Sequence, residues 1–127
     1  MSGLNQIVGV IEDNISVRGA LHRLFRSAGF EVFLFATAEE FFADPHRADL
    51  DCLVIDVCLP GMDGLELLER VRAESPARTV AIIITSNDDE QVRNRAVAAG
   101  ASGFFLKPFD NHQLRFAVSQ ALGSKAS

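Results

Sequence analysis

Short apolar runs alternate along the chain with segments whose apolar residues recur at helical spacing. The runs lie at residues 7–11, 30–35, 52–56, 80–85 and 103–106, and several of them are continuously apolar. Continuous apolar runs of this length are typical of strands that are buried on both faces, as in a parallel sheet covered by helices. The pattern therefore predicts five strands, each followed by a helix.

Apolar stripes at helical spacing follow each run, over residues 17–28, 37–44, 65–74, 92–99 and 114–121. Thr37 and Glu40 have the spacing of a capping box, so the second of these helices is expected to begin there. The resulting order predicts an α/β fold, a doubly wound five-stranded parallel sheet with helices on both faces.

Glycine and proline residues mark where these helices are expected to end. Gly29 and Gly100 follow the first and fourth stripes, and Gly123 follows the fifth. Ser75 and Pro76 follow the third stripe, and proline cannot continue a helix. We therefore expect helix ends at these four points.

Composition is consistent with one globular domain over residues 1–127. Hydrophobic residues make up 48% of the chain and charged residues 23%, a balance that argues against disorder. No apolar run approaches the length needed to span a bilayer, and the first residues lack the features of a secretory signal. We expect a cytoplasmic protein that does not bind membranes.

Charge and cysteine content exclude further classes of protein. The net charge of −5 disfavours binding of nucleic acid by the domain itself. Cys52 and Cys58 are expected too far apart along an extended segment for a disulfide, and free thiols fit a reducing compartment. The histidines have no metal-ligand spacing with either cysteine.

Polar residues follow four of the predicted strands, at their carboxyl ends. In open α/β sheets, binding sites form at this edge, so these side chains are expected to converge. They are Glu12, Asp13, Asp56, Thr85 and Lys107.

Clustered carboxylates raise one another's pKa unless a cation lies among them. Hard oxygen ligands of this kind suit Mg²⁺. A carboxylate can also attack phosphorus and form an aspartyl phosphate, and phosphoryl transfer depends mainly on positioning and charge stabilisation. A divalent cation, the Lys107 ammonium and the Thr85 hydroxyl would supply both, so the set predicts phosphorylation of Asp56.

Four motifs lie in order at the ends of successive strands: Glu12-Asp13, "DVCLPGMDG" at 56–64, "TS" at 85–86 and "FFLKPF" at 104–109. With these motifs the whole chain resembles the receiver domain of bacterial two-component response regulators. The resemblance implies a flavodoxin-like (βα)5 fold similar to that of chemotaxis regulators.

The resemblance also implies roles for the site residues. Asp56 is implied to be the phosphoryl acceptor. Asp13, Asp56 and the backbone carbonyl of Cys58 are implied to hold Mg²⁺ or Mn²⁺, with Glu12 acting mainly through a metal-bound water. Lys107 is implied to pair with the phosphoryl oxygens and to precede a cis peptide bond.

Switching and partners follow from the same resemblance. Thr85 is implied to bind a phosphoryl oxygen, and Phe104 to be an aromatic switch that reshapes the region from the fourth strand to the fifth helix. A sensor histidine kinase or phosphotransfer protein would supply the phosphoryl group. The domain would then be a signalling domain that catalyses only its own phosphorylation and dephosphorylation.

Phe116 lies off the buried stripe of the last helix, so we expect it to be exposed and a candidate homodimer or partner contact.

Each motif taken alone has a plainer interpretation. Glu12-Asp13 could be a solvated turn, and Thr85 could only cap the next helix. Lys107 could be a surface residue before a turn, Phe104 could be core, and Phe116 could be an isolated exposed residue without a role.

Three rival functions remain for comparison. A phosphohydrolase of the haloacid-dehalogenase type needs a second Asp two residues after the nucleophile, where this chain has Cys58. A flavodoxin-like cofactor binder needs a phosphate loop after the first strand, where Glu12 and Asp13 would repel phosphate. A receiver-like scaffold that only binds partners would not need the intact acids and Lys107.

Overall fold

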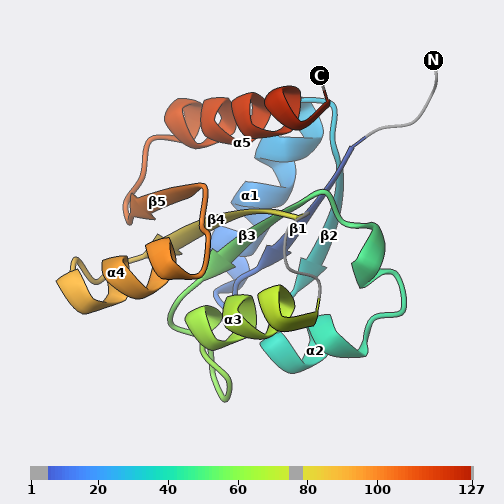
Figure 1. The fold of residues 1–127 in the computed structure, drawn as a ribbon. Coiled ribbons are helices and arrows are strands. Elements are labelled where there is room, and N and C mark those ends of the chain that lie inside the picture. The colour runs from blue at the N-terminus through green and yellow to red at the C-terminus, as the bar shows by residue number, and fades with distance from the viewer. Residues whose placement is uncertain (1–5, 75–78, 127) are drawn as a thin grey trace.

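The computed structural model describes residues 6–74 and 79–126, in which strands and helices alternate (Figure 1). In chain order the elements are β1 (Ile7–Ile11), α1 (Ile15–Ser27), β2 (Glu31–Phe35), α2 (Ala38–Ala43), the 3₁₀ turn η1 (Arg47–Asp49), β3 (Cys52–Asp56), α3 (Gly64–Glu74), β4 (Val80–Thr85), α4 (Glu90–Ala98), β5 (Gly103–Leu106) and α5 (Asn111–Ala126). All five predicted strands and helices are present, which confirms the expected fold class.

The sheet is parallel throughout, with strand order β2-β1-β3-β4-β5. The chain moves outward from β1 to β2, and then crosses back to form β3 on the other side of β1. This reversal makes the carboxyl ends of β1 and β3 the switch point of the fold, where loops diverge and leave room for a ligand. The two strands end at Ile11 and Asp56.

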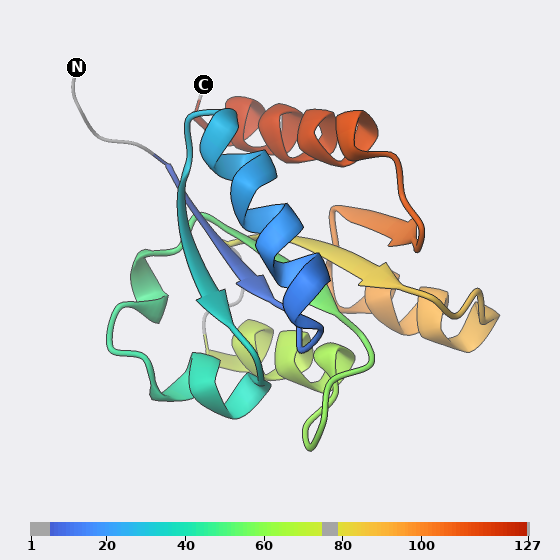
Figure 2. The ribbon, with the colours of Figure 1, turned by 180° about the vertical axis from the view of Figure 1, so that it is seen from behind.

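Helices cover both faces of the sheet, α1 and α5 on one and α2, α3 and α4 on the other (Figures 1 and 2). The two sets of side chains form separate cores, one containing Leu21, Phe25 and Leu114, the other containing Phe41 and Leu68. Every residue of the central strand β3 is buried, because both of its faces contribute to a core. This explains why its sequence is continuously apolar as far as Asp56.

Local signals for helix ends operate largely as predicted. The Thr37 hydroxyl accepts a hydrogen bond from Glu40 N at 3.0 Å. In a full capping box the Glu40 carboxylate would accept from Thr37 N, but here it accepts from Ala36 N. Gly29 and Gly100 follow α1 and α4 with φ of 96° and 80°. Residues with a Cβ rarely adopt this left-handed region, so glycine is suited to both stops.

Two predictions about element ends need correction. Gly123 does not stop the last helix, since α5 continues to Ala126. Nothing lies within 4 Å of the position that a Cβ on Gly123 would take, so a helical backbone is tolerated there at a modest entropic cost. The second strand begins at Glu31, one residue later than expected. The predicted break at Ser75 and Pro76 lies outside the described residues.

Arg72 joins three segments through main-chain carbonyls. Its guanidinium donates to Ala99 O at 2.9 Å, to Thr79 O at 2.8 Å and to Gly100 O at 3.1 Å. The acceptors at Ala99 and Gly100 lie just beyond α4, where the helix dipole favours a cation. Burial lowers the pKa of Arg72 from its ordinary value. Arg72 therefore links α3 to the end of α4 and to Thr79, the residue directly before β4.

Replacing Arg72 by methionine is expected to reduce the free energy of unfolding by about 2 kcal/mol, because three carbonyls lose a charged donor. Urea unfolding followed by circular dichroism would measure the change. Arg70→Met is the matched control on the same helix. The Arg70 guanidinium lies 5.9 Å from the Phe42 ring, a contact worth about 0.5–1 kcal/mol at an exposed site. Equal losses for the two variants would contradict the role of Arg72.

Candidate functional site

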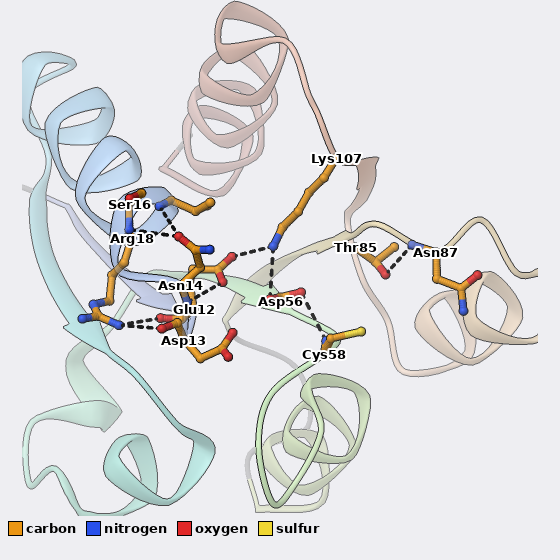
Figure 3. A network of polar contacts seen from close by, with 11 residues as sticks. Glu12, Asp13, Asn14, Ser16, Arg18, Asp56, Cys58, Thr85, Asn87 and Lys107 are labelled. Atoms are coloured by element: carbon orange, nitrogen blue, oxygen red, sulfur yellow. Dashed lines mark hydrogen bonds and ion pairs between the residues drawn. The ribbon is translucent and has the colours of Figure 1, made fainter.

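Five of the predicted site residues meet at the carboxyl edge of the sheet: Glu12, Asp13, Asp56, Thr85 and Lys107 (Figure 3). Asp56 and Thr85 are the last residues of β3 and β4. Glu12 directly follows β1, and Lys107 directly follows β5. Because the strands are parallel and adjacent, residues far apart in the sequence meet at one edge.

Glu12, Asp13 and Asp56 form a cluster in which one oxygen from each carboxylate lies within 4.8 Å of the others. Glu12 and Asp56 are buried, with 0% and 3% of their surface exposed, whereas Asp13 is exposed. The interpretation as a solvated turn thus fits Asp13 but is wrong for Glu12. The Cys58 thiol is exposed and is not part of this cluster.

The Lys107 ammonium lies between two of the acids, 2.9 Å from Glu12 Oε1 and 3.2 Å from Asp56 Oδ2. Burial alone would lower the pKa of Lys107, but the Glu12 hydrogen bond and the Asp56 charge outweigh burial and raise it above the ordinary value. Lys107 therefore stays protonated beside Asp56. Its peptide bond to Pro108 is cis, as the resemblance implies.

The pKa of Glu12 is raised above its ordinary value. Burial is the main cause that raises its pKa, and the charge of Asp56 adds to it. A hydrogen bond from Asn14 N to Glu12 Oε2 at 3.0 Å and the Lys107 ammonium act in the opposite direction. Glu12 therefore binds a proton more tightly than an ordinary carboxyl group, and added positive charge nearby would favour its ionised form.

The donor set fits a hard divalent cation. Glu12 Oε1 is buried, and its charged partner in the described residues is the Lys107 ammonium at 2.9 Å. Glu12, Asp13 and Asp56 together offer the carboxylate ligands that Mg²⁺ prefers.

The loop after β3 fixes the Asp56 side chain from the other side. Cys58 N donates to Asp56 Oδ1 at 3.2 Å, while Lys107 contacts Oδ2. Gly64 N donates to Val57 O at 2.9 Å, which brings the start of α3 directly against the end of β3. A Cβ built on Gly64 would overlap the carbonyl oxygen of Asp56. The loop therefore requires glycine here to hold Asp56 in position.

Thr85 is fully buried, and its hydroxyl accepts a hydrogen bond from Asn87 N at 3.1 Å. The helix cap of α4 is instead Asp89, whose carboxylate accepts from Gln91 N at 2.7 Å. The alternative that Thr85 only caps the next helix is therefore wrong.

The two aromatic residues predicted from the sequence lie on β5 and α5. Phe104 is half-buried against the core beneath α3 and α4. Phe116 has 64% of its surface exposed on α5, which confirms the exposure expected from its helical position.

Two arginines at the site were not predicted. Arg18 on α1 reaches back to the carbonyl oxygens of Glu12 and Asp13, at 3.0 and 3.4 Å from its Nη1. The Arg93 guanidinium lies 4.5 Å from the centre of the Phe104 ring. Both are single arginines on helices among twelve basic residues, and no spacing in the sequence distinguishes them.

Comparison with known proteins agrees with this geometry. A family model described as the response regulator receiver domain matches residues 8–119. Nodulation protein W of Bradyrhizobium diazoefficiens is 41% identical over 118 residues, which cover 91% of this chain and 50% of that protein. The transcriptional regulatory protein FixJ of the same organism is 35% identical over 113 residues, which cover 89% of this chain and 55% of that protein. This chain thus spans about half the length of these curated relatives.

A solved structure supports the fold assignment. The CheY-like receiver domain protein of Methanospirillum hungatei JF-1 superposes with a TM-score of 0.90 at 23% identity, covering 97% of this chain and 98% of that chain. Receiver domains are signalling domains of two-component systems, with a phosphorylation switch and an acidic Mg²⁺ pocket that are general to the family. The match over residues 8–119 and the identities of the relatives show that this chain belongs to the family of response regulator receiver domains.

Proposed function

We propose that Asp56 accepts a phosphoryl group from a histidine kinase or phosphotransfer protein in a Mg²⁺-dependent reaction. The observation that carries this proposal is the contact of Lys107 Nζ with Asp56 Oδ2 at 3.2 Å, beside two further carboxylates. A carboxylate at a sheet edge, flanked by a fixed cation and by cation ligands, is equipped to attack phosphorus.

In the proposed step an oxygen of the Asp56 carboxylate forms a bond to phosphorus. The bond from phosphorus to the donor breaks, and its electron pair leaves with the imidazole nitrogen of a phosphohistidine or with the acetate of acetyl phosphate. Lys107 pairs with the phosphoryl oxygens, and the Thr85 hydroxyl binds one of them. The contribution of these residues is mainly electrostatic, because the charge on the equatorial oxygens must be stabilised.

The cation would be held by Asp13, Asp56 and the backbone carbonyl of Cys58, with Glu12 acting mainly through a water. When bound, Mg²⁺ (or Mn²⁺) supplies positive charge that offsets the acids and the incoming phosphoryl group. The cluster of Glu12, Asp13 and Asp56, with one oxygen of each within 4.8 Å of the others, supports this assignment.

Mg²⁺ is expected to stabilise the folded protein, because only the folded state brings the three acids together. At ten times its dissociation constant the gain is about 1.4 kcal/mol. The melting temperature with MgCl₂, compared with NaCl of equal ionic strength, would measure it. Asp13→Asn is expected to weaken this response. An unchanged response in that variant would contradict the ligand assignment of Asp13.

The output would be a change of shape. A shift of Thr85 and Phe104 would reshape the β4-α4-β5-α5 face, which carries the exposed Phe116. We propose that this face controls a partner, an output domain or dimerisation of the chain. Sedimentation with and without a phosphoryl mimic tests dimerisation, and Phe116→Ser is expected to weaken any association. Equal sedimentation in both states would count against the dimer.

Cell context follows from the same assignment. We propose that residues 1–127 act as one cytoplasmic receiver domain that binds neither nucleic acid nor membrane by itself, and that catalyses only its own phosphorylation and dephosphorylation. In the described part of the chain no helix is both long and apolar enough to cross a bilayer. The output of the whole protein is part of the proposal, because the matched relatives are about twice as long.

Intact-mass analysis after incubation with Mg²⁺ and acetyl phosphate tests the function directly. The expected result is the mass of one added phosphoryl group on the wild type and none on Asp56→Asn. Turnover of an added phosphoester would instead favour a phosphohydrolase. A wild type that is never labelled, by acetyl phosphate or by a phosphorylated histidine protein, would favour a scaffold and overturn the proposal.

A further inference from the structure

Arg93 on α4 contacts two segments beside the site, the strand β5 and the loop between β4 and α4. Its guanidinium lies 4.5 Å from the centre of the Phe104 ring on β5, a close cation–π contact. Its Nη2 also lies 2.7 Å from Asp88 Oδ1, in the loop between β4 and α4. The Arg93 side chain thus contacts both the Phe104 ring and that loop.

Thr85 and Phe104 face the same side of the sheet. Ile83 pairs with Phe104 in the register of β4 and β5, and paired residues of neighbouring strands point to the same side. Thr85 lies two residues after Ile83, so its side chain points to that side as well. The layer that contains α4, and hence Arg93, covers this side.

The loop between β4 and α4 also forms a hydrogen bond with Thr85. The Thr85 hydroxyl accepts from Asn87 N at 3.1 Å, and Asp88 is the next residue. The contacts therefore form a series from Thr85 through Asn87, Asp88 and Arg93 to Phe104. A movement of Thr85 toward a phosphoryl group on Asp56 would displace the loop and so strain the contacts of Arg93.

We propose that Arg93 is a positioning residue that holds Phe104 and the β4–α4 loop in their resting arrangement and so restrains the phosphorylation of Asp56. This inference rests on the proposed function. Coupling between two events is reciprocal. If phosphorylation loosens the contact between Arg93 and Phe104, then that contact disfavours the phosphorylated state by the same factor at equilibrium. It also lowers the fraction of unphosphorylated molecules in the arrangement that reacts, and this fraction scales the rate.

Replacement of Arg93 by glutamine is expected to speed labelling by acetyl phosphate about threefold, the factor expected for one partly exposed cation–π contact. The rate is measured by intact mass at several acetyl phosphate concentrations with Mg²⁺ saturating. The gain should appear in the maximal rate and not in the half-saturating concentration, because Arg93 does not touch the donor. Arg93→Lys keeps the cation and is expected to stay near the wild-type rate.

Arg95→Gln is the matched control on the same helix. Arg95 bonds Glu69 through two nitrogens, at 2.9 and 3.3 Å, and its partner lies on α3 instead of β5. If loosening α4 were sufficient, this variant would be faster as well. In a Phe104→Leu background, Arg93→Gln should add no further gain, since its partner ring is gone. Asp88→Asn should give a smaller gain than Arg93→Gln.

The possible outcomes separate this inference from the proposed function. A labelled wild type together with equal rates for Arg93→Gln and Arg95→Gln overturns the role of Arg93 and leaves the proposed function standing. A gain that persists fully in the Phe104→Leu background also overturns it. A wild type that is never labelled would overturn both the role of Arg93 and the proposed function.

Discussion

Replacing Gly64 by alanine is expected to destabilise the fold by about 3 kcal/mol. The added methyl group would overlap the main-chain carbonyl oxygen of Asp56 and approach Ile55 Cγ2 to 2.7 Å. Neither obstacle is the end of a flexible side chain, so β3 or α3 must shift as a whole. A loss of this size is a large part of the stability of a small domain.

The free energy of unfolding from urea titrations measures this effect. Gly123→Ala is the matched control, because it makes the same change in a helix with nothing within 4 Å of the new Cβ. That variant is expected to gain about 0.5 kcal/mol, since alanine loses less backbone entropy than glycine in a helix. If the two variants unfolded at the same urea concentration, the close approach at Gly64 would not limit stability.

Replacing Lys107 by methionine is expected to slow phosphorylation of Asp56 about 100-fold, the usual effect of removing one fixed charge from a developing anionic centre. Methionine retains much of the apolar stem, so the loss reports mainly on the ammonium. Labelling by acetyl phosphate in saturating Mg²⁺ would measure the rate.

The same variant has a second expected effect. Without the ammonium, Glu12 and Asp56 lose the cation that lies 2.9 and 3.2 Å away, so the Mg²⁺-free protein should melt at a lower temperature. Lys107→Arg restores charge but not shape, and should recover the melting temperature better than the rate. A rate within a few-fold of the wild type for Lys107→Met would show that Lys107 is not part of the phosphorylation machinery.

Local patterns in the sequence were sufficient for the fold. Continuous apolar runs identified the strands, and stripes at helical spacing identified the helices, because burial on two faces or on one face leaves a direct mark on residue order. They failed at Gly123, where α5 continues. A glycine is only weakly unfavourable in a helix, so a glycine by itself does not determine where a helix ends.

The sequence alone also brought Glu12, Asp13, Asp56, Thr85 and Lys107 to one edge of the sheet, because parallel strands align their carboxyl ends. Only the tertiary structure decided which contacts these residues make. It shows the burial of Glu12 and its ion pair with Lys107, the contact of Arg93 with the Phe104 ring, and the hydrogen bonds from Arg18 to the carbonyl oxygens of Glu12 and Asp13. The physical reason is that periodicity reports which face of an element is buried. The distance between two side chains from different elements depends on how the elements pack, and residue order along one element does not encode it.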